Sequence, residues 1–219
     1  MINNFNELQK ICKFEHGTYY KFVALIRKKD YDENNKPILN VNKRGEIFVR
    51  QWFIDSEESL NKYKDDMINL CNALKCRLYM GLDKKSVKKT IVNMQKQINE
   101  MVCQYIYNPD FQPSVRKLSK FSASASQLAE CSASDKYWML DIDYDKCVYD
   151  NPIQISFLQQ VFEKHYVTTL KTLNGYHMIL KRNFDIHKVL NNGMLFDKNT
   201  LFEYVEVKEN CLTLVYKGE

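Results

Sequence analysis

The chain has 219 residues, which is enough for one sizeable domain that buries roughly 70% of the surface it exposes when unfolded. Hydrophobic residues make up 45% of it and only 6 glycines and 4 prolines occur, so disordered, collagen-like and linker-rich chains are excluded. Its 32 lysines and arginines and 27 aspartates and glutamates leave a net charge of +5, which permits an anionic partner without requiring one.

Cysteine usage and hydropathy indicate the compartment. The 7 cysteines are scattered and form no Cys-x-x-Cys pair, so we expect reduced thiols, no disulfide framework and no zinc site. The first seven residues lack the basic and apolar segments of a secretory signal. Apolar runs reach only about five residues, far short of the roughly 20 that span a bilayer. We therefore expect a cytoplasmic protein without a membrane partner.

The first 107 residues alternate between strand and helix patterns. Apolar and aromatic runs predict strands, whereas apolar residues at three- and four-residue spacing predict helices. Asp55 and Ser56 supply the start signal of the first helix. This order predicts an α/β layer with strands at 18–27, 46–54 and 77–82, a loop or hairpin tip at 28–44, and helices carrying apolar residues at 60–74 and 87–105.

Residues 108–134 break this pattern with two prolines and a run of small polar side chains. They predict a surface connection with one helical turn around residues 127–130. The connection separates the N-terminal α/β part, residues 1–107, from a C-terminal part, residues 135–219, within one domain.

The C-terminal part contains a second set of alternating elements. A strand pair turning at Asn174-Gly175 gives a strong hairpin signal. The order β-α-β-β-α-β resembles the split βαβ, RRM-like arrangement. The expected elements are strands at 137–143, 166–170 and 176–181, helices at 153–164 and 185–191, and a closing hairpin of 204–207 with 212–216. The fold class is therefore α/β (α+β).

Two aspartates end the strand at 137–143. Because side chains alternate along a strand, Asp141 and Asp143 share the face opposite Leu140 and Ile142. Two carboxylates about 7 Å apart disfavour joint ionisation unless a cation lies between them, and Mg²⁺ or Mn²⁺ suits such oxygen ligands. The alternative is an exposed face with two solvated acids, although aspartate is unfavourable in strands.

A histidine follows the Asn174-Gly175 turn. His177 has lysines on either side of it along the chain, at positions 171 and 181, and this combination suits a phosphate tail. The alternative is a packed strand histidine with no ligand.

A glutamate stands between two valines on the strand at 204–207. Glu206 therefore lies on the strand face opposite both valines, which is also typical of an outward-facing edge residue. In a β-α-β-β-α-β sheet, its strand can lie near that of Asp141 and Asp143. Three carboxylates and a histidine on one face would define a two-metal phosphoryl-transfer site.

The order of these motifs resembles the archaeo-eukaryotic primase superfamily. The Asp141-x-Asp143 strand, the Gly175-Tyr176-His177 strand after a Lys-Thr turn, and a late acidic strand carry the resemblance. It is greatest to the small stand-alone primase-like proteins of bacteriophages and mobile elements. The wider context agrees over roughly residues 45–219, through the segments 52–56, 76–80, 84–86 and 212–216.

The resemblance implies a primase catalytic core, in which the RRM-like sheet carries the chemistry. The implied activity is a primase or primase-polymerase that makes primers on a single-stranded DNA template from nucleoside triphosphates. It also implies a bacterial cell or phage-infected host and, because no helicase module is evident, a separate replicative helicase. By this resemblance the metal ligands for Mg²⁺ or Mn²⁺ are Asp141, Asp143 and Glu206, and the nucleotide-binding residues are His177, Lys171, Arg77 and Lys84.

Some features depart from the family pattern. Gly175 stands where a small hydroxyl residue usually precedes the histidine by two positions, and the third acid is glutamate, which makes Asp185 and Glu203 rivals for its role. Basic clusters at 84–89 and 116–120 are candidates for a template groove. Two other functions remain open: a catalytically silent protein that binds nucleic acid or a replisome partner, and a metal-dependent nuclease.

Overall fold

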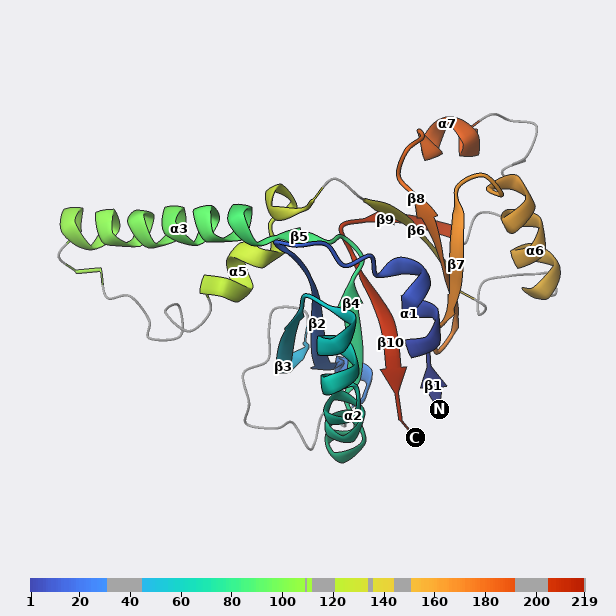
Figure 1. The fold of residues 1–219 in the computed structure, drawn as a ribbon, viewed down its shortest axis with the longest axis horizontal. Helices are drawn as coiled ribbons and strands as arrows, with labels where there is room; N and C mark the ends of the chain where they lie inside the picture. The colour runs from blue at the N-terminus through green and yellow to red at the C-terminus, as the bar shows by residue number, and fades with distance from the viewer. Residues whose placement is uncertain are drawn as a thin grey trace.

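Two antiparallel β-sheets organise the chain, with helices at their faces and edges (Figure 1). The computed structural model describes residues 1–30, 45–108, 110–111, 121–133, 136–143, 151–191 and 205–218. These residues confirm a mixed α/β protein. Within these ranges, no helix combines the length and the apolar character needed to cross a membrane.

The first sheet has the strand order β1-β10-β4-β2-β3, and the short β5 also pairs with β2. Most of its strands come from the N-terminal part, but the last strand of the chain lies between β1 and β4. The bounds are β1 Ile2–Asn3, β2 Thr18–Ile26, β3 Ile47–Ile54, β4 Arg77–Gly81, β5 Lys85–Ser86 and β10 Leu212–Lys217.

The second sheet has the order β7-β8-β6-β9. On one face, Trp138, Leu140 and Met178 form a core with two helices, so these strands alternate as the sequence predicts. The other face turns toward the first sheet. The bounds are β6 Tyr137–Asp143, β7 Tyr166–Lys171, β8 Gly175–Lys181, β9 Val205–Glu209, α6 Asn151–Val161 and α7 Ile186–Asn191.

The closing hairpin predicted from the sequence is wrong. β9 pairs with β6 in the second sheet, whereas β10 crosses to the first sheet and pairs with β4 and β1. Asn210, with φ of 46°, makes the turn between them. β10 is buried on both faces through Thr213, Leu214 and Val215, which suits a central strand better than a sheet edge. The end of the chain therefore links the two sheets.

Helix α2 Glu57–Leu74 packs on the first sheet, and α1 Phe5–Ile11 lies against β7 of the second sheet. Leu8 of α1 and Met67 and Cys71 of α2 are buried in one core. The predicted start of α2 is confirmed, because the Ser56 hydroxyl accepts a hydrogen bond of 3.1 Å from the backbone N–H of Ser59. A short 3-10 turn, η1, covers Lys28–Asp30.

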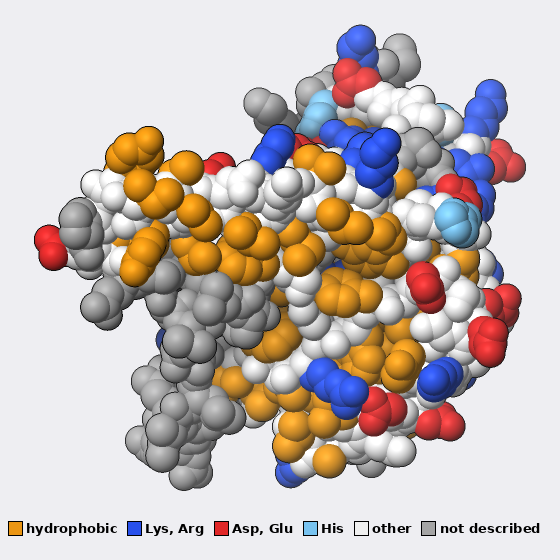
Figure 2. All heavy atoms as spheres, turned by 60° about the vertical axis from the view of Figure 1, so that its left-hand side comes forward, with side chains coloured by type: hydrophobic (Ala, Val, Ile, Leu, Met, Phe, Trp, Pro, Cys, Tyr) orange, Lys and Arg blue, Asp and Glu red, His pale blue; other side chains and the backbone are white. Residues whose placement is uncertain are grey.

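Helix α3 Val87–Tyr107 extends away from the sheets (Figure 1). Its apolar residues recur as predicted, but much of the apolar stripe is exposed: Ile91 is 58% and Tyr105 62% accessible. Figure 2 shows hydrophobic side chains gathered along this helix. Helical periodicity therefore identified the element without indicating which of its faces the rest of the chain covers.

The region predicted as a surface connection is partly a packed element. Its described residues form α5 Phe121–Gln127 and the 3-10 turn η3 Ala129–Cys131, which lie against α3. Ala125 and Cys131 are fully buried, and Asn93 Nδ2 of α3 donates to Cys131 Sγ at 3.2 Å. The small side chains that resemble a linker in the sequence here permit close helix packing.

Candidate nucleotide and metal site

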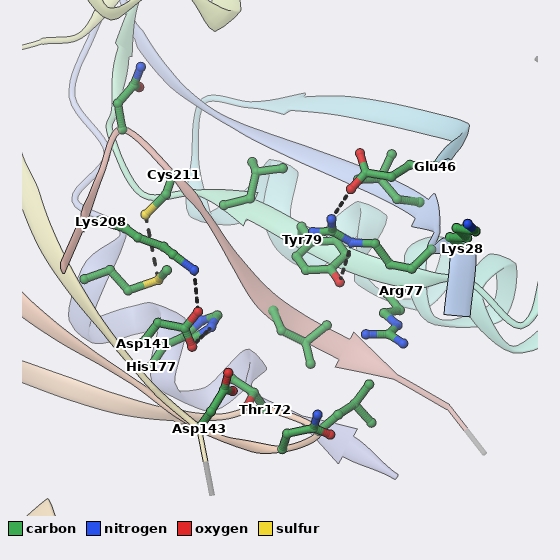
Figure 3. Close-up of a pocket in the computed structure, with 18 residues that line it drawn as sticks. Lys28, Glu46, Arg77, Tyr79, Asp141, Asp143, Thr172, His177, Lys208 and Cys211 are labelled. Carbon is green, nitrogen blue, oxygen red and sulfur yellow. Dashed lines mark hydrogen bonds and ion pairs between the residues drawn. The ribbon is translucent and has the colours of Figure 1, made fainter. Parts of the chain in front are cut away.

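A pocket of about 790 Å³ lies between the two sheets (Figure 3). Its walls come from β2, β4 and β10 on one side and from β6, β8 and the β7–β8 turn on the other. It is of the size that small-molecule sites have in proteins. The basic and acidic side chains that line it are Arg27, Lys28, Glu46, Arg77, Asp141, Asp143, His177 and Lys208.

Asp141 and His177 lie at the centre of the second sheet's pocket wall. They are register partners on β6 and β8, so their side chains share a face. His177 Nε2 lies 3.3 Å from Asp141 Oδ1, and both side chains are largely buried. The acidic strand and the histidine strand are therefore direct neighbours in the sheet. Asp141 faces the pocket because side chains alternate along β6, which buries Leu140 and Ile142 on the opposite face.

His177 also contacts the first sheet. Its Nδ1 lies 2.9 Å from the hydroxyl of Thr213 on β10, and both residues are buried. Both ring nitrogens therefore have protein partners, one in each sheet. Sequence reasoning missed Thr213, because β10 was expected beside β9 rather than opposite β8.

Lys208 is the second partner of Asp141. Its Nζ lies 2.5 Å from Asp141 Oδ2 and 2.9 Å from Glu206 Oε2, so one ammonium bridges two carboxylates. Burial alone would raise the pKa of Asp141, but hydrogen bonds from His177 and Lys208 outweigh it and lower that pKa to about 2. Burial likewise opposes the charge of Lys208, and the two carboxylates overcome it and raise the lysine pKa.

The remaining acids differ in how they relate to the pocket. Asp143 lines it, two residues beyond Asp141 on the same strand face. Glu206 is the register partner of Asp141 on β9, hence on the same face, but its side chain is 71% exposed and is not among the pocket residues. Of its two rivals, Glu203 lies outside the described residues, and Asp185 accepts backbone hydrogen bonds from His187 and Lys188 at the start of α7.

The donor chemistry fits a divalent ion in part. Asp141 and Asp143 offer carboxylate oxygens side by side at the pocket, the ligand type that Mg²⁺ and Mn²⁺ take. In the described ranges, however, no three His, Cys, Asp or Glu side chains gather closely enough to hold a metal ion. The ammonium of Lys208 lies between Asp141 and Glu206, so the third acid does not complete the set in this arrangement.

Gly175 allows the close approach of the two strands at this point. It is the register partner of Asp143, and a Cβ added to it would come within 1.8 Å of the carbonyl oxygen of Ile142. A residue with a side chain at this position would force the two strands apart.

Two predicted nucleotide contacts lie outside the pocket. Lys171 alternates with the buried Leu170, the register partner of His177, so its exposed side chain lies on the other face of β7. Its backbone is held by the Asn4 side chain at 3.2 and 2.8 Å. Lys84 is fully buried and pairs with Glu15 at 2.7 Å.

Arg77 does line the pocket, but it has an acidic partner. Its guanidinium binds both carboxylate oxygens of Asp30, and Lys217 adds a contact of 3.3 Å. Burial opposes the charged forms of both groups, and their pairing overcomes it, raising the pKa of Arg77 and lowering that of Asp30. Arg77 thus anchors η1 to β4 at the rim of the pocket.

Further cations at the pocket were not found from the sequence. Arg27 pairs with Glu46 and donates to the Tyr79 hydroxyl at 3.1 Å, with its guanidinium 4.8 Å from the centre of the Tyr79 ring. Lys28, the first residue of η1, also lines the pocket (Figure 3). These residues come from the ends of strands in the first sheet, and only the tertiary fold brings them opposite Asp141.

The predicted basic clusters are described only in part. Residues 116–120 lie outside the described part of the chain. In the 84–89 cluster, Lys85 is 5% exposed and donates to Ser132 Oγ and Asn210 Oδ1, each at 3.0 Å. Lys84 is also buried, whereas Lys88 and Lys89 of the same cluster are exposed on α3, where Lys89 Nζ donates to the Ser132 carbonyl at 2.9 Å.

Comparisons with known proteins assign neither a family nor a function to this chain. No protein-family model matches the chain, and no curated protein or solved structure matches it either.

Proposed function

We propose that the chain is a primase-type nucleotidyltransferase and that the pocket between the sheets is its active site. The observation that carries the proposal is the convergence of Asp141, Asp143 and His177, from two neighbouring strands, on a pocket whose opposite wall carries Arg27 and Lys28. Carboxylates facing cations across a nucleotide-sized space suit a triphosphate and its metal.

In this proposal, Asp141 and Asp143 hold Mg²⁺ or Mn²⁺. When bound, the ion neutralises phosphate charge and favours attack by a 3′-hydroxyl. The basic residues of the first sheet bind and orient the triphosphate, as guanidinium and ammonium groups do in phosphate sites. Met139 and Leu214 give the pocket a buried apolar part of its lining.

His177 serves two roles in the proposed site. Thr213 fixes its ring through Nδ1, and Nε2 then faces Asp141 and the pocket. We assign His177 to orienting Asp141 and, when nucleotide is bound, to contacting the triphosphate. A histidine clamped between two sheets would also couple their relative position to the site.

The topology of the second sheet supports its assignment as an RRM-like catalytic sheet. The second sheet follows the element order β6-α6-β7-β8-α7-β9, the β-α-β-β-α-β order of the split βαβ, RRM-like arrangement. Its acidic strand β6 is central, flanked by β8 and β9. This is the placement expected of a primase catalytic sheet beside an N-terminal α/β layer.

One observation favours a second candidate, a catalytically silent protein that binds nucleic acid or a replisome partner. Lys208 already neutralises Asp141 and Glu206, and a site that needs no metal would keep this ion pair permanently. The two candidates make different predictions for the aspartates, because only the enzyme needs them for turnover.

The testing experiment incubates the protein with single-stranded DNA, Mn²⁺ and labelled nucleotides, with ribo- and deoxynucleotides in separate reactions. We expect labelled products longer than a single nucleotide. Absence of products in both reactions, with intact template, would favour the silent candidate. Shortened template would indicate a nuclease.

A further inference from the structure

Lys208 occupies the carboxylate of Asp141, the residue proposed to bind the metal ion. Lys208 Nζ lies 2.5 Å from Asp141 Oδ2, the shorter of its two carboxylate contacts. His177 Nε2 lies 3.3 Å from the other oxygen of the same carboxylate. Both oxygens of the proposed metal ligand therefore already have partners, and one partner carries a full positive charge.

A divalent ion and this ammonium compete for the same oxygen. A metal bound to Asp141 Oδ2 would lie within a few ångströms of Nζ, where two positive charges repel strongly at the low effective dielectric of a pocket. The ammonium can leave, because lysine has a flexible four-carbon side chain and this one is 33% exposed. Glu206, which is 71% exposed, offers a carboxylate to receive it outside the pocket.

We propose that Lys208 is an internal counter-cation that a divalent metal ion must displace from Asp141. In the metal-free protein it neutralises the acids of β6 and β9. When metal binds, Lys208 pairs with Glu206 alone, and Glu206 acts as the acceptor of this lysine rather than as a metal ligand. The inference rests on the proposed function, because it takes Asp141 to be a metal ligand.

The test measures binding of Mn²⁺ alone, by calorimetry on the full chain without nucleotide or template. Lys208→Met removes the charge and keeps an apolar stem of similar length. It should bind Mn²⁺ at least about tenfold more tightly than the unaltered protein, because a repelling unit charge next to the ligand is lost. Lys164→Met removes the same charge from an exposed position outside the pocket and should leave the affinity unchanged.

A second variant at Lys208 separates the effect of the lost charge from the effect of a folding defect. Lys208→Gln keeps a polar group, should also tighten Mn²⁺ binding, and can be compared with Lys208→Met by circular dichroism and thermal unfolding. If the unaltered protein and a folded Lys208 variant bind Mn²⁺ with equal affinity, the inference about Lys208 is wrong, but the metal site of the proposed function stands. Weaker binding in the variant also overturns it, since Lys208 would then support the metal. Absence of Mn²⁺ binding in every protein overturns both the inference and the metal site of the proposed function.

Discussion

His177 on β8 and Thr213 on β10 join the two sheets through a contact of 2.9 Å between Nδ1 and Oγ1. Both residues are buried, Thr213 completely. The contact fixes the ring whose other nitrogen faces Asp141, so the position of the last strand bears directly on the proposed active site.

Thr213→Val should lower the free energy of unfolding by about 1–3 kcal/mol, because a buried ring nitrogen loses its partner while the side-chain shape is kept. Thr213→Ser retains the hydroxyl and serves as the control. Urea denaturation measures both. If valine and serine have the same effect, the hydroxyl does not hold His177.

Gly175→Ala should destabilise the second sheet by about 1–3 kcal/mol, because the new Cβ would meet the Ile142 carbonyl at 1.8 Å and push β8 away from β6. Gly81→Ala is a matched control, since the nearest atom to its added Cβ is 3.7 Å away. Thermal unfolding distinguishes the two. Equal stability of both variants would mean that the strands separate at Gly175 at no cost.

The ion pair of Asp30 and Arg77 predicts acid sensitivity. The pKa of Asp30 is lower in the folded protein than in the unfolded chain, so its contribution to stability is complete above the ordinary aspartate pKa of about 4. That contribution is lost as the pH falls from there through the lowered folded pKa. Asp30→Asn should reduce stability at neutral pH by about 3–5 kcal/mol and flatten this pH dependence. Parallel pH profiles of the two proteins would contradict the assignment.

Lys21 predicts a second pH dependence of stability, in alkaline solution. Burial, with the nearby charge of Lys85, lowers the pKa of Lys21 to about 8. Between about pH 8 and the ordinary lysine pKa of about 10.4, the unfolded chain binds more protons at this residue, so its contribution makes stability rise with pH. Lys21→Met should remove that rise, measured as the difference between the two proteins' urea midpoints across this range. If the difference between the two urea midpoints does not change with pH, the pKa of Lys21 is not lowered by burial.

The sequence predicted the acidic strand and the histidine strand because their signals are local. Alternation in residues 137–143 places Asp141 and Asp143 on one face, and the Asn174-Gly175 turn marks the start of the strand that carries His177. The pairing of β6 with β8, which brings His177 beside Asp141, is a contact between strands distant in the sequence.

The rest of the site depends on contacts distant in the sequence. Lys208 and Thr213 are close to each other along the chain, yet they lie in different sheets, and the hairpin expected there concealed the role of both. Arg27 reaches the pocket only because the first sheet lies opposite the second. Lys171 was expected to contact phosphate together with His177, but strand alternation places its side chain on the face opposite His177.

The most direct measurement of the central claim is template-dependent nucleotide incorporation by the unaltered protein and by the Asp141→Ala, Asp143→Ala double variant. Glu163→Ala, an exposed acid away from the pocket, is the matched control. We expect synthesis by the unaltered protein and by the control, and a loss of at least about 1,000-fold in the double variant if the two carboxylates hold the catalytic metal. Equal synthesis by the double variant and the unaltered protein would contradict the assignment of the pocket as the active site.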